Sequence, residues 1–136
     1  MFLLDTHVLS ELRRRDRTHP RVAAWADGVR AADLHLSAIT LLEIEAGMLL
    51  LARRDAAQGA MLRAWIDAKV LPAFAGRILP VDTAVAQRCA RLHVPDPRTE
   101  RDALIAATAL VHRLQVVTRN VADFRPMGVE LLDPWE

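Results

Sequence analysis

Short apolar runs alternate along the chain with longer segments in which apolar residues recur every three or four positions. The short runs have the length and composition of buried strands and cover residues 1–4, 34–38, 78–81, 115–118 and 129–132. The longer segments have the periodicity of helices and cover residues 8–14, 21–29, 41–54, 57–70, 83–93 and 100–113. Strands that alternate with helices predict an α/β fold with a parallel sheet and right-handed crossovers.

The element boundaries follow from local signals. Thr40 has the side chain of a helix N-cap and is expected to begin the helix over 41–54, and Asp82 or Thr83 should begin the helix that ends near His93. Pro72 is expected to follow the end of the helix over 57–70. The segment 94–99 contains two prolines and is predicted to be a loop.

Four acidic residues lie where predicted strands end or where the following helices begin. They are Asp5, Glu43, Asp102 and Asp123. Parallel strands end at one edge of a sheet, and open α/β sheets bind their ligands at that edge. Carboxylates gathered there repel one another, so they should hold a divalent cation or have raised pKa values.

Each acid also has a structural interpretation. Thr40 and Glu43 have the spacing of a capping box, Thr99 and Asp102 have the same spacing, and Asp123 could cap a short turn. Asp5 is hardest to explain in this way, because a buried carboxylate without a partner costs several kcal/mol. As an N-cap of a helix starting at Thr6, Asp5 would still lie at the same edge. Four caps at one edge are a weaker explanation than one shared site.

Composition narrows the classes of function. The chain has 136 residues, 52% of them hydrophobic, which suits one compact domain, and it is expected to be cytoplasmic with no membrane contact. The single Cys89 excludes an internal disulfide and a cysteine metal cluster. A net charge of +1 gives no bulk attraction to nucleic acid, although every basic residue except Lys69 is arginine, the side chain suited to phosphate. No P-loop, no dinucleotide-binding glycine motif and no serine-hydrolase motif is present.

Four segments around the acids resemble the sequence blocks of PIN-domain ribonucleases, specifically the VapC-type toxins. These segments are 3–7, 37–43, 102–109 and 118–124, and the resemblance runs along the whole chain. The stretches 74–80 and 133–135 resemble the FitB-like branch. The resemblance implies a single PIN domain over residues 1–136, with a three-layer α/β/α fold and a central parallel sheet of four to five strands.

The same resemblance implies a toxin of a type II toxin–antitoxin system that hydrolyses RNA phosphodiester bonds as a Mg²⁺-dependent endoribonuclease, with Mn²⁺ as a possible substitute. It carries over Asp5, Glu43, Asp102 and Asp123 as the catalytic acids, with Asp5 and Asp102 as direct metal ligands. Thr6, Thr118 and Asn120 are expected to orient carboxylates or water. Asn120 stands where some FitB-like members have an acid, which leaves Asp123 as the fourth acid. His7 stands where asparagine is common and is expected to be an orienting or loop residue.

The resemblance also leads to expectations about the substrate and the protein partner. Single-stranded loop RNA is the expected substrate, because its backbone is accessible. The arginines expected to contact phosphate are Arg13, Arg14, Arg15 and Arg119, and a solvated helix end equally explains the first three. The implied partner is a cognate VapB/FitA-type antitoxin with a DNA-binding domain. Apolar residues in 49–51 and 61–71 are expected to form an interaction surface, which would bind either this antitoxin or a second copy of the chain in a homodimer within a larger complex. Ordinary core packing is the other explanation for these residues.

Other classes of function remain as alternatives. A phosphatase of the haloacid-dehalogenase kind needs a second aspartate at position 7, where this chain has histidine, and a receiver domain needs a lysine near a strand end, which Lys69 does not provide. The non-enzymatic alternative is a catalytically weak PIN-like module that binds RNA or an antitoxin.

Overall fold

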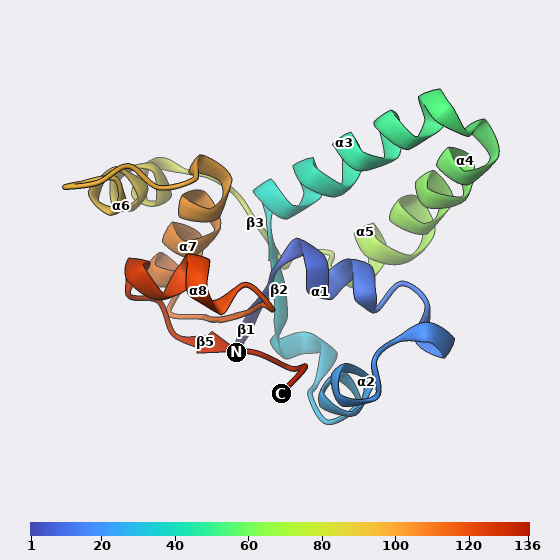
Figure 1. The fold of residues 1–136 in the computed structure, drawn as a ribbon, viewed down its shortest axis with the longest axis horizontal. Helices are drawn as coiled ribbons and strands as arrows, with labels where there is room; N and C mark the ends of the chain where they lie inside the picture. The colour runs from blue at the N-terminus through green and yellow to red at the C-terminus, as the bar shows by residue number, and fades with distance from the viewer.

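The computed structural model describes residues 1–136 and has at its centre a five-stranded, fully parallel sheet (Figure 1). The strands are β1 (Phe2–Leu4), β2 (Leu34–Ser37), β3 (Ile78–Leu79), β4 (Gln115–Val117) and β5 (Leu131–Leu132). Their order across the sheet is β3-β2-β1-β4-β5. The predicted parallel α/β architecture is therefore confirmed, although the last strand is shorter than the run over 129–132 suggested.

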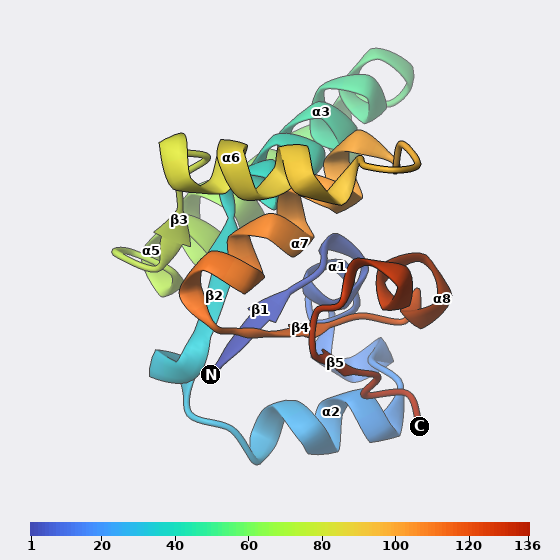
Figure 2. The same cartoon turned by 90° about the vertical axis from the view of Figure 1, so that its left-hand side faces the viewer.

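Helices cover both faces of the sheet. They are α1 (Thr6–Glu11), α2 (Pro20–Asp27), α3 (Ala38–Arg54), α4 (Ala56–Trp65), α5 (Leu71–Ala73), α6 (Thr83–Leu92), α7 (Glu100–His112) and α8 (Val121–Phe124). In Figure 1, α3 and α4 form an antiparallel hairpin that extends from one side of the molecule. Figure 2 shows α6 lying across α7, which itself packs against the sheet.

The side chains of the neighbouring strands β1 and β4 alternate between two apolar cores, because successive residues of a strand face opposite sides. Leu3 and Val116 belong to the core under α6, α7 and α8. Leu4 and Val117 belong to the core under α1, α3 and α4. Burial on both faces explains why β1 is apolar throughout and why β4 is apolar after Gln115.

Helix α3 begins earlier than the sequence suggested. Its N-cap is Ser37, whose hydroxyl oxygen accepts a hydrogen bond from the amide of Ile39 at 3.0 Å. Thr40 lies inside the helix, is fully buried and has no hydrogen-bond partner for its hydroxyl. The predicted cap at Thr40 is therefore wrong: Ser37 ends β2 and can leave the strand in the extended conformation that an N-cap needs.

The helix that follows the hairpin turn continues past the predicted stop at Pro72. A π-helical turn over Ile66–Val70 joins α4 to α5, with the amide of Leu71 bonded to the carbonyl of Ile66 five residues earlier. Pro72 falls in the first turn of α5, directly after the π-helical turn. The α1 segment is also shorter than predicted and ends at Glu11, so Arg13, Arg14 and Arg15 follow it in a turn, an extended residue and a short 3₁₀ helix.

The order of the strands creates a switch point beside β1. From β1 the chain proceeds to β2 and β3 on one side, and then returns to place β4 on the other side. In open α/β sheets the crevice at the carboxyl end of such a switch point is the usual place for ligands. Asp5 follows β1 and Thr118 follows β4, so both lie at this crevice. None of the helices has the length and apolar character needed to cross a membrane.

Candidate metal centre

Asp5 is a buried residue fixed by two hydrogen bonds to its carboxylate and one from its backbone amide. It lies between β1 and α1, is 4% exposed, and its Oδ1 accepts a hydrogen bond from the amide of Thr6 at 2.7 Å. The hydroxyl of Thr118 donates to Asp5 Oδ2 at 2.8 Å, and the amide of Asp5 donates to the carbonyl of Val117. Asp5 thus caps α1 and is also fixed across the two central strands. Capping alone does not explain the bond from Thr118.

Glu43 points toward the same place from the second turn of α3. The hydroxyl of Thr6 donates to Glu43 Oε1 at 2.7 Å, which joins residues 37 positions apart. The capping-box interpretation of Glu43 is wrong, because Thr40 is not the N-cap and Glu43 bonds to Thr6 instead. Arg101 lies near the other oxygen, with 3.9 Å between its guanidinium nitrogen and Glu43 Oε2.

Asp102 lies in the first turn of α7, and its pKa is raised above the ordinary aspartate value. Burial is the largest cause, followed by repulsion from Asp5, Asp123 and Glu43, while His7 acts in the opposite direction. Thr99 precedes the helix but makes no side-chain cap hydrogen bond, so a capping box does not account for Asp102. The three acids that raise this pKa come from three other segments of the chain, so Asp5, Glu43 and Asp123 each lie close enough to Asp102 to act on its charge.

The last segment brings Asp123 and Asn120 to the edge beyond β4. Asp123 lies in the short helix α8, and its backbone amide donates to the carbonyl of Asn120. The amide of Asn120 donates to the hydroxyl of Thr118 at 3.0 Å, so Thr118 connects this segment to Asp5. His7 Nδ1 lies 3.7 Å from Asp5 Oδ2, and its side chain is exposed at the rim.

The donor set suits a hard cation that keeps most of its water. No group of three or more His, Cys, Asp and Glu side chains comes close enough to one point to enclose an ion. Mg²⁺ is usually bound through one or two carboxylates and retains several waters, so it does not require such a group. Carboxylate oxygens are the donors that hard divalent cations prefer.

The four arginines singled out in the sequence occupy different surroundings. Arg13 stacks on Trp65, with 5.9 Å between the guanidinium carbon and the ring centre, and Arg119 stacks on Trp135 at 5.1 Å. Arg119 also lines a surface pocket with Asn120 and Asp123. Arg15 forms an ion pair with Asp27, and Arg14 is exposed. Sequence reasoning missed Arg101, whose one available signal was its place beside Asp102.

Replacing Asp102 with asparagine should stabilise the metal-free protein near neutral pH. Between the ordinary aspartate pKa and the raised pKa of Asp102, the folded state binds more protons than the unfolded state. The free energy of unfolding therefore falls as pH rises through this range. Above it the Asp102 charge opposes folding, and asparagine removes that charge. The expected result is a higher midpoint of thermal unfolding at pH ~7 and little difference at pH ~3, where Asp102 is protonated in both states.

Circular dichroism during heating measures this effect, with Asp96→Asn in the exposed loop as the matched control. Added Mg²⁺ should reduce or reverse the gain, because the variant has lost a ligand. A variant less stable than the wild type without metal at pH ~7 would contradict the repulsion among the four acids.

With this geometry established, comparisons with known proteins identify the family. The chain matches the PIN domain over residues 2–127 and belongs to that family. It is 38% identical to Toxin FitB of Neisseria gonorrhoeae, covering 99% of each chain, and 35% identical to VapC ribonuclease Y4jK of Sinorhizobium fredii, covering 100% of this chain and 99% of the relative.

A solved structure confirms the fold assignment. The crystal structure of FitAcB from Neisseria gonorrhoeae superposes with a TM-score of 0.91 at 38% identity, covering 100% of this chain and 99% of the other. The predicted resemblance to VapC-type and FitB-like PIN proteins is therefore confirmed.

Proposed function

We propose that the chain is the toxin of a toxin–antitoxin pair and acts as an endoribonuclease that hydrolyses RNA phosphodiester bonds with Mg²⁺, or Mn²⁺ in its place. The observation that carries this proposal is the hydrogen-bonded arrangement of Asp5 and Glu43 with Thr6 and Thr118 at the carboxyl edge of the sheet. Asp102 lies close enough to these acids for them to raise its pKa. Carboxylates this close to one another repel, and a cation bound among them would relieve that repulsion. The relatives named as a toxin and as a ribonuclease supply the class of reaction.

The contacts of the four acids suggest a separate role for each pair. Asp5 and Asp102 would hold the metal, and Glu43 and Asp123 would hold its waters. A bound Mg²⁺ would lower the pKa of the attacking water and neutralise charge on the phosphate. Thr118 and the amide of Thr6 fix the two oxygens of Asp5, and the hydroxyl of Thr6 fixes Glu43, so the carboxylates need little rearrangement on binding.

The surface of the α3–α4 hairpin has the apolar character of a site that binds a protein partner. Leu42, Leu49 and Leu50 on α3 and Met61 on α4 are exposed apolar side chains. Exposed apolar side chains gathered on one pair of helices are typical of interaction surfaces. An antitoxin of the VapB/FitA type, or a second copy of the chain, would cover them in the complex.

RNA cleavage by the purified protein, free of any antitoxin, tests the proposed activity. We expect discrete cuts in total bacterial RNA with Mg²⁺ or Mn²⁺ and none with EDTA, and sequencing of the cut ends would identify the substrate. Intact RNA under all conditions would reject the nuclease and favour a catalytically weak module that binds RNA or antitoxin. Cleavage with EDTA at the same rate as with Mg²⁺ or Mn²⁺ would show that the reaction does not require a divalent metal.

Replacing Thr118 with valine should weaken both metal binding and cleavage by about 10- to 100-fold, because valine keeps the shape but loses the hydrogen bond to Asp5. Thr118→Ser retains the hydroxyl and serves as the control that should recover most of both. Calorimetric Mn²⁺ titration and initial cleavage rates measure the two effects. A valine variant with wild-type metal affinity and rate would show that Thr118 does not orient Asp5.

A further inference from the structure

A surface groove leads away from the acidic edge between α1, α3 and α4. Its volume is about 330 Å³, and one end is lined by Thr6 and Glu43. The groove then follows one side of α3 toward the C-terminal end of that helix. The rest of its lining includes Arg13, Gly47, Arg54 and Trp65.

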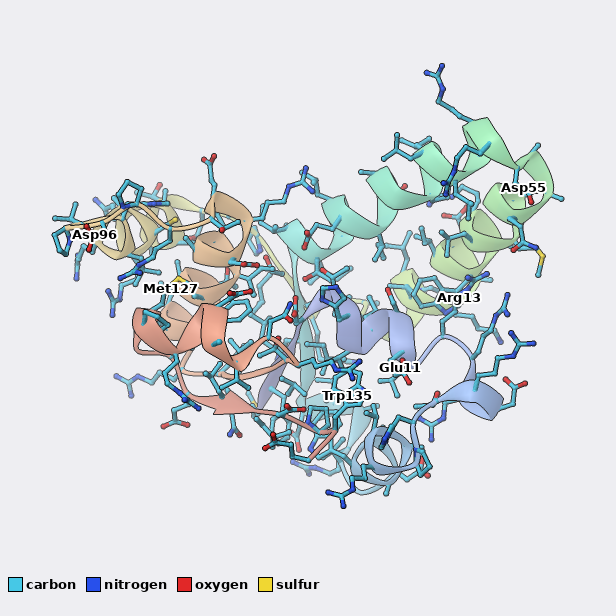
Figure 3. All side chains as sticks on the ribbon, viewed as in Figure 1. Glu11, Arg13, Asp55, Asp96, Met127 and Trp135 are labelled. Atoms are coloured by element: carbon cyan, nitrogen blue, oxygen red, sulfur yellow. The ribbon has the colours of Figure 1, made fainter.

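The two arginines in this groove have no acidic partner in the chain. Arg15, Arg30, Arg63 and Arg101 are all close to a carboxylate, whereas Arg13 and Arg54 take part in no ion pair. Arg13 is instead stacked on Trp65, which orders its side chain and leaves its N–H groups available. Figure 3 shows Arg13 beyond the end of α1, on the side of α4. A guanidinium group without an internal partner is suited to an external phosphate, and that of Arg13 is also ordered by Trp65.

Gly47 keeps the middle of the groove open. It is exposed in the interior of α3, where glycine costs about 1 kcal/mol relative to alanine. A Cβ added at Gly47 would meet no atom within 4 Å, so helix packing does not require glycine there. The contrast with Gly59 is direct, because a Cβ at Gly59 would lie 2.5 Å from Cα of Ala52, where α3 and α4 cross. Packing therefore explains the glycine at position 59 but not the glycine at position 47, which lines the groove.

The length and charge of the groove fit an extended strand. Glu43 and Arg54 are eleven residues apart on α3, which corresponds to about 16 Å along the helix. The acidic end adjoins the proposed metal centre, and the basic groups lie farther along. A strand of RNA with its cleaved bond at the acids would place neighbouring phosphates along the groove beside the arginines.

We propose that this groove binds the single-stranded RNA on one side of the cleaved bond, with Arg13 and Arg54 as phosphate contacts and Gly47 as the opening that admits the backbone. This proposal rests on the proposed function, since it gives the path of the substrate of that same site. Trp65 acts by positioning Arg13.

Steady-state cleavage by Arg13→Gln, Arg54→Gln and Gly47→Gln tests the groove, with Arg53→Gln as the matched control because Arg53 is exposed on α3 and does not line the groove. Each of the three variants should raise KM by about three- to ten-fold and change kcat little. The control should keep both values. Far-UV circular dichroism should show intact folds, and glutamine at position 47 should not lower the melting temperature, because it favours the helix more than glycine does.

Binding to labelled RNA separates this inference from the nuclease itself. In Asp5→Asn protein with Mg²⁺, fluorescence anisotropy measures the affinity for a randomised RNA of about 12 nucleotides over a range of salt concentrations. Each arginine removed should reduce the slope of log K against log salt by about 0.7, which a purely structural role would not do. The same result is expected even if the wild-type protein cuts no RNA.

Two outcomes would overturn the proposal. If the wild-type protein cleaves RNA and the three groove variants keep its KM and salt slope, the groove is not the RNA path while the nuclease stands. If RNA binding is unchanged but the variants lose association with a co-expressed antitoxin, the groove belongs to a protein partner.

Discussion

Asp5→Asn is expected to reduce RNA cleavage by about 100-fold or more, the largest effect on activity of any single substitution in this chain. The asparagine keeps the size of the side chain but lacks the negative charge that would hold a cation. Asp5 is also the most buried of the four acids, at 4% exposed, so water has little room to replace the lost ligand. Initial rates on RNA with Mg²⁺, and Mn²⁺ affinity by calorimetry, measure the loss.

The control for this substitution is Asp96→Asn, which removes the same charge from the exposed loop between α6 and α7. The loop variant should cleave at the wild-type rate. A folded Asp5→Asn protein that keeps wild-type activity would remove Asp5 from the site, because no other carboxylate has the same contacts to Thr6 and Thr118.

The largest expected effect on stability comes from Phe124→Ala, at about 3–5 kcal/mol. Phe124 is fully buried, and it packs in the core under α6, α7 and α8. Truncation leaves a cavity that short helices such as α8 cannot easily close. Phe124 follows Asp123 directly in α8, so the same substitution should also make the position of the Asp123 carboxylate less fixed. The RNA-cleavage rate of the protein that remains folded should then fall.

Urea unfolding of the two proteins measures the stability difference, with Val94→Ala as a control. Val94 is 74% exposed, so its truncation should change stability by less than about 0.5 kcal/mol. An equally small effect for Phe124→Ala would mean that the α8 segment does not pack on the sheet as described.

The fold and the four acids could be predicted because both depend on local patterns. Short apolar runs such as residues 2–4 and 116–117 are typical of strands buried on both faces, which indicates a parallel sheet covered on two sides. Once the strands are parallel, Asp5 must lie at the edge where the following helices begin. The raised pKa of Asp102 agrees with the repulsion expected of acids gathered there.

Contacts between distant segments could not be predicted. Whether Glu43 caps its own helix or accepts a hydrogen bond from Thr6 depends on where α3 begins, and Ser37 and Thr40 are both good caps by residue type. The helix across Pro72 needed a π-helical turn, which has no clear sequence signal. The groove from Glu43 to Arg54 became visible only when α1, α3 and α4 were placed together.

Anomalous X-ray scattering from crystals soaked with Mn²⁺ tests the central claim most directly, namely that the acids at the end of β1 and the start of α7 jointly hold a cation. The expected result is a Mn²⁺ peak in contact with carboxylate oxygens of Asp5 and Asp102, absent from Asp5→Asn crystals. A fully soaked wild-type crystal with no peak among the four acids, or with its manganese bound elsewhere, would contradict the claim.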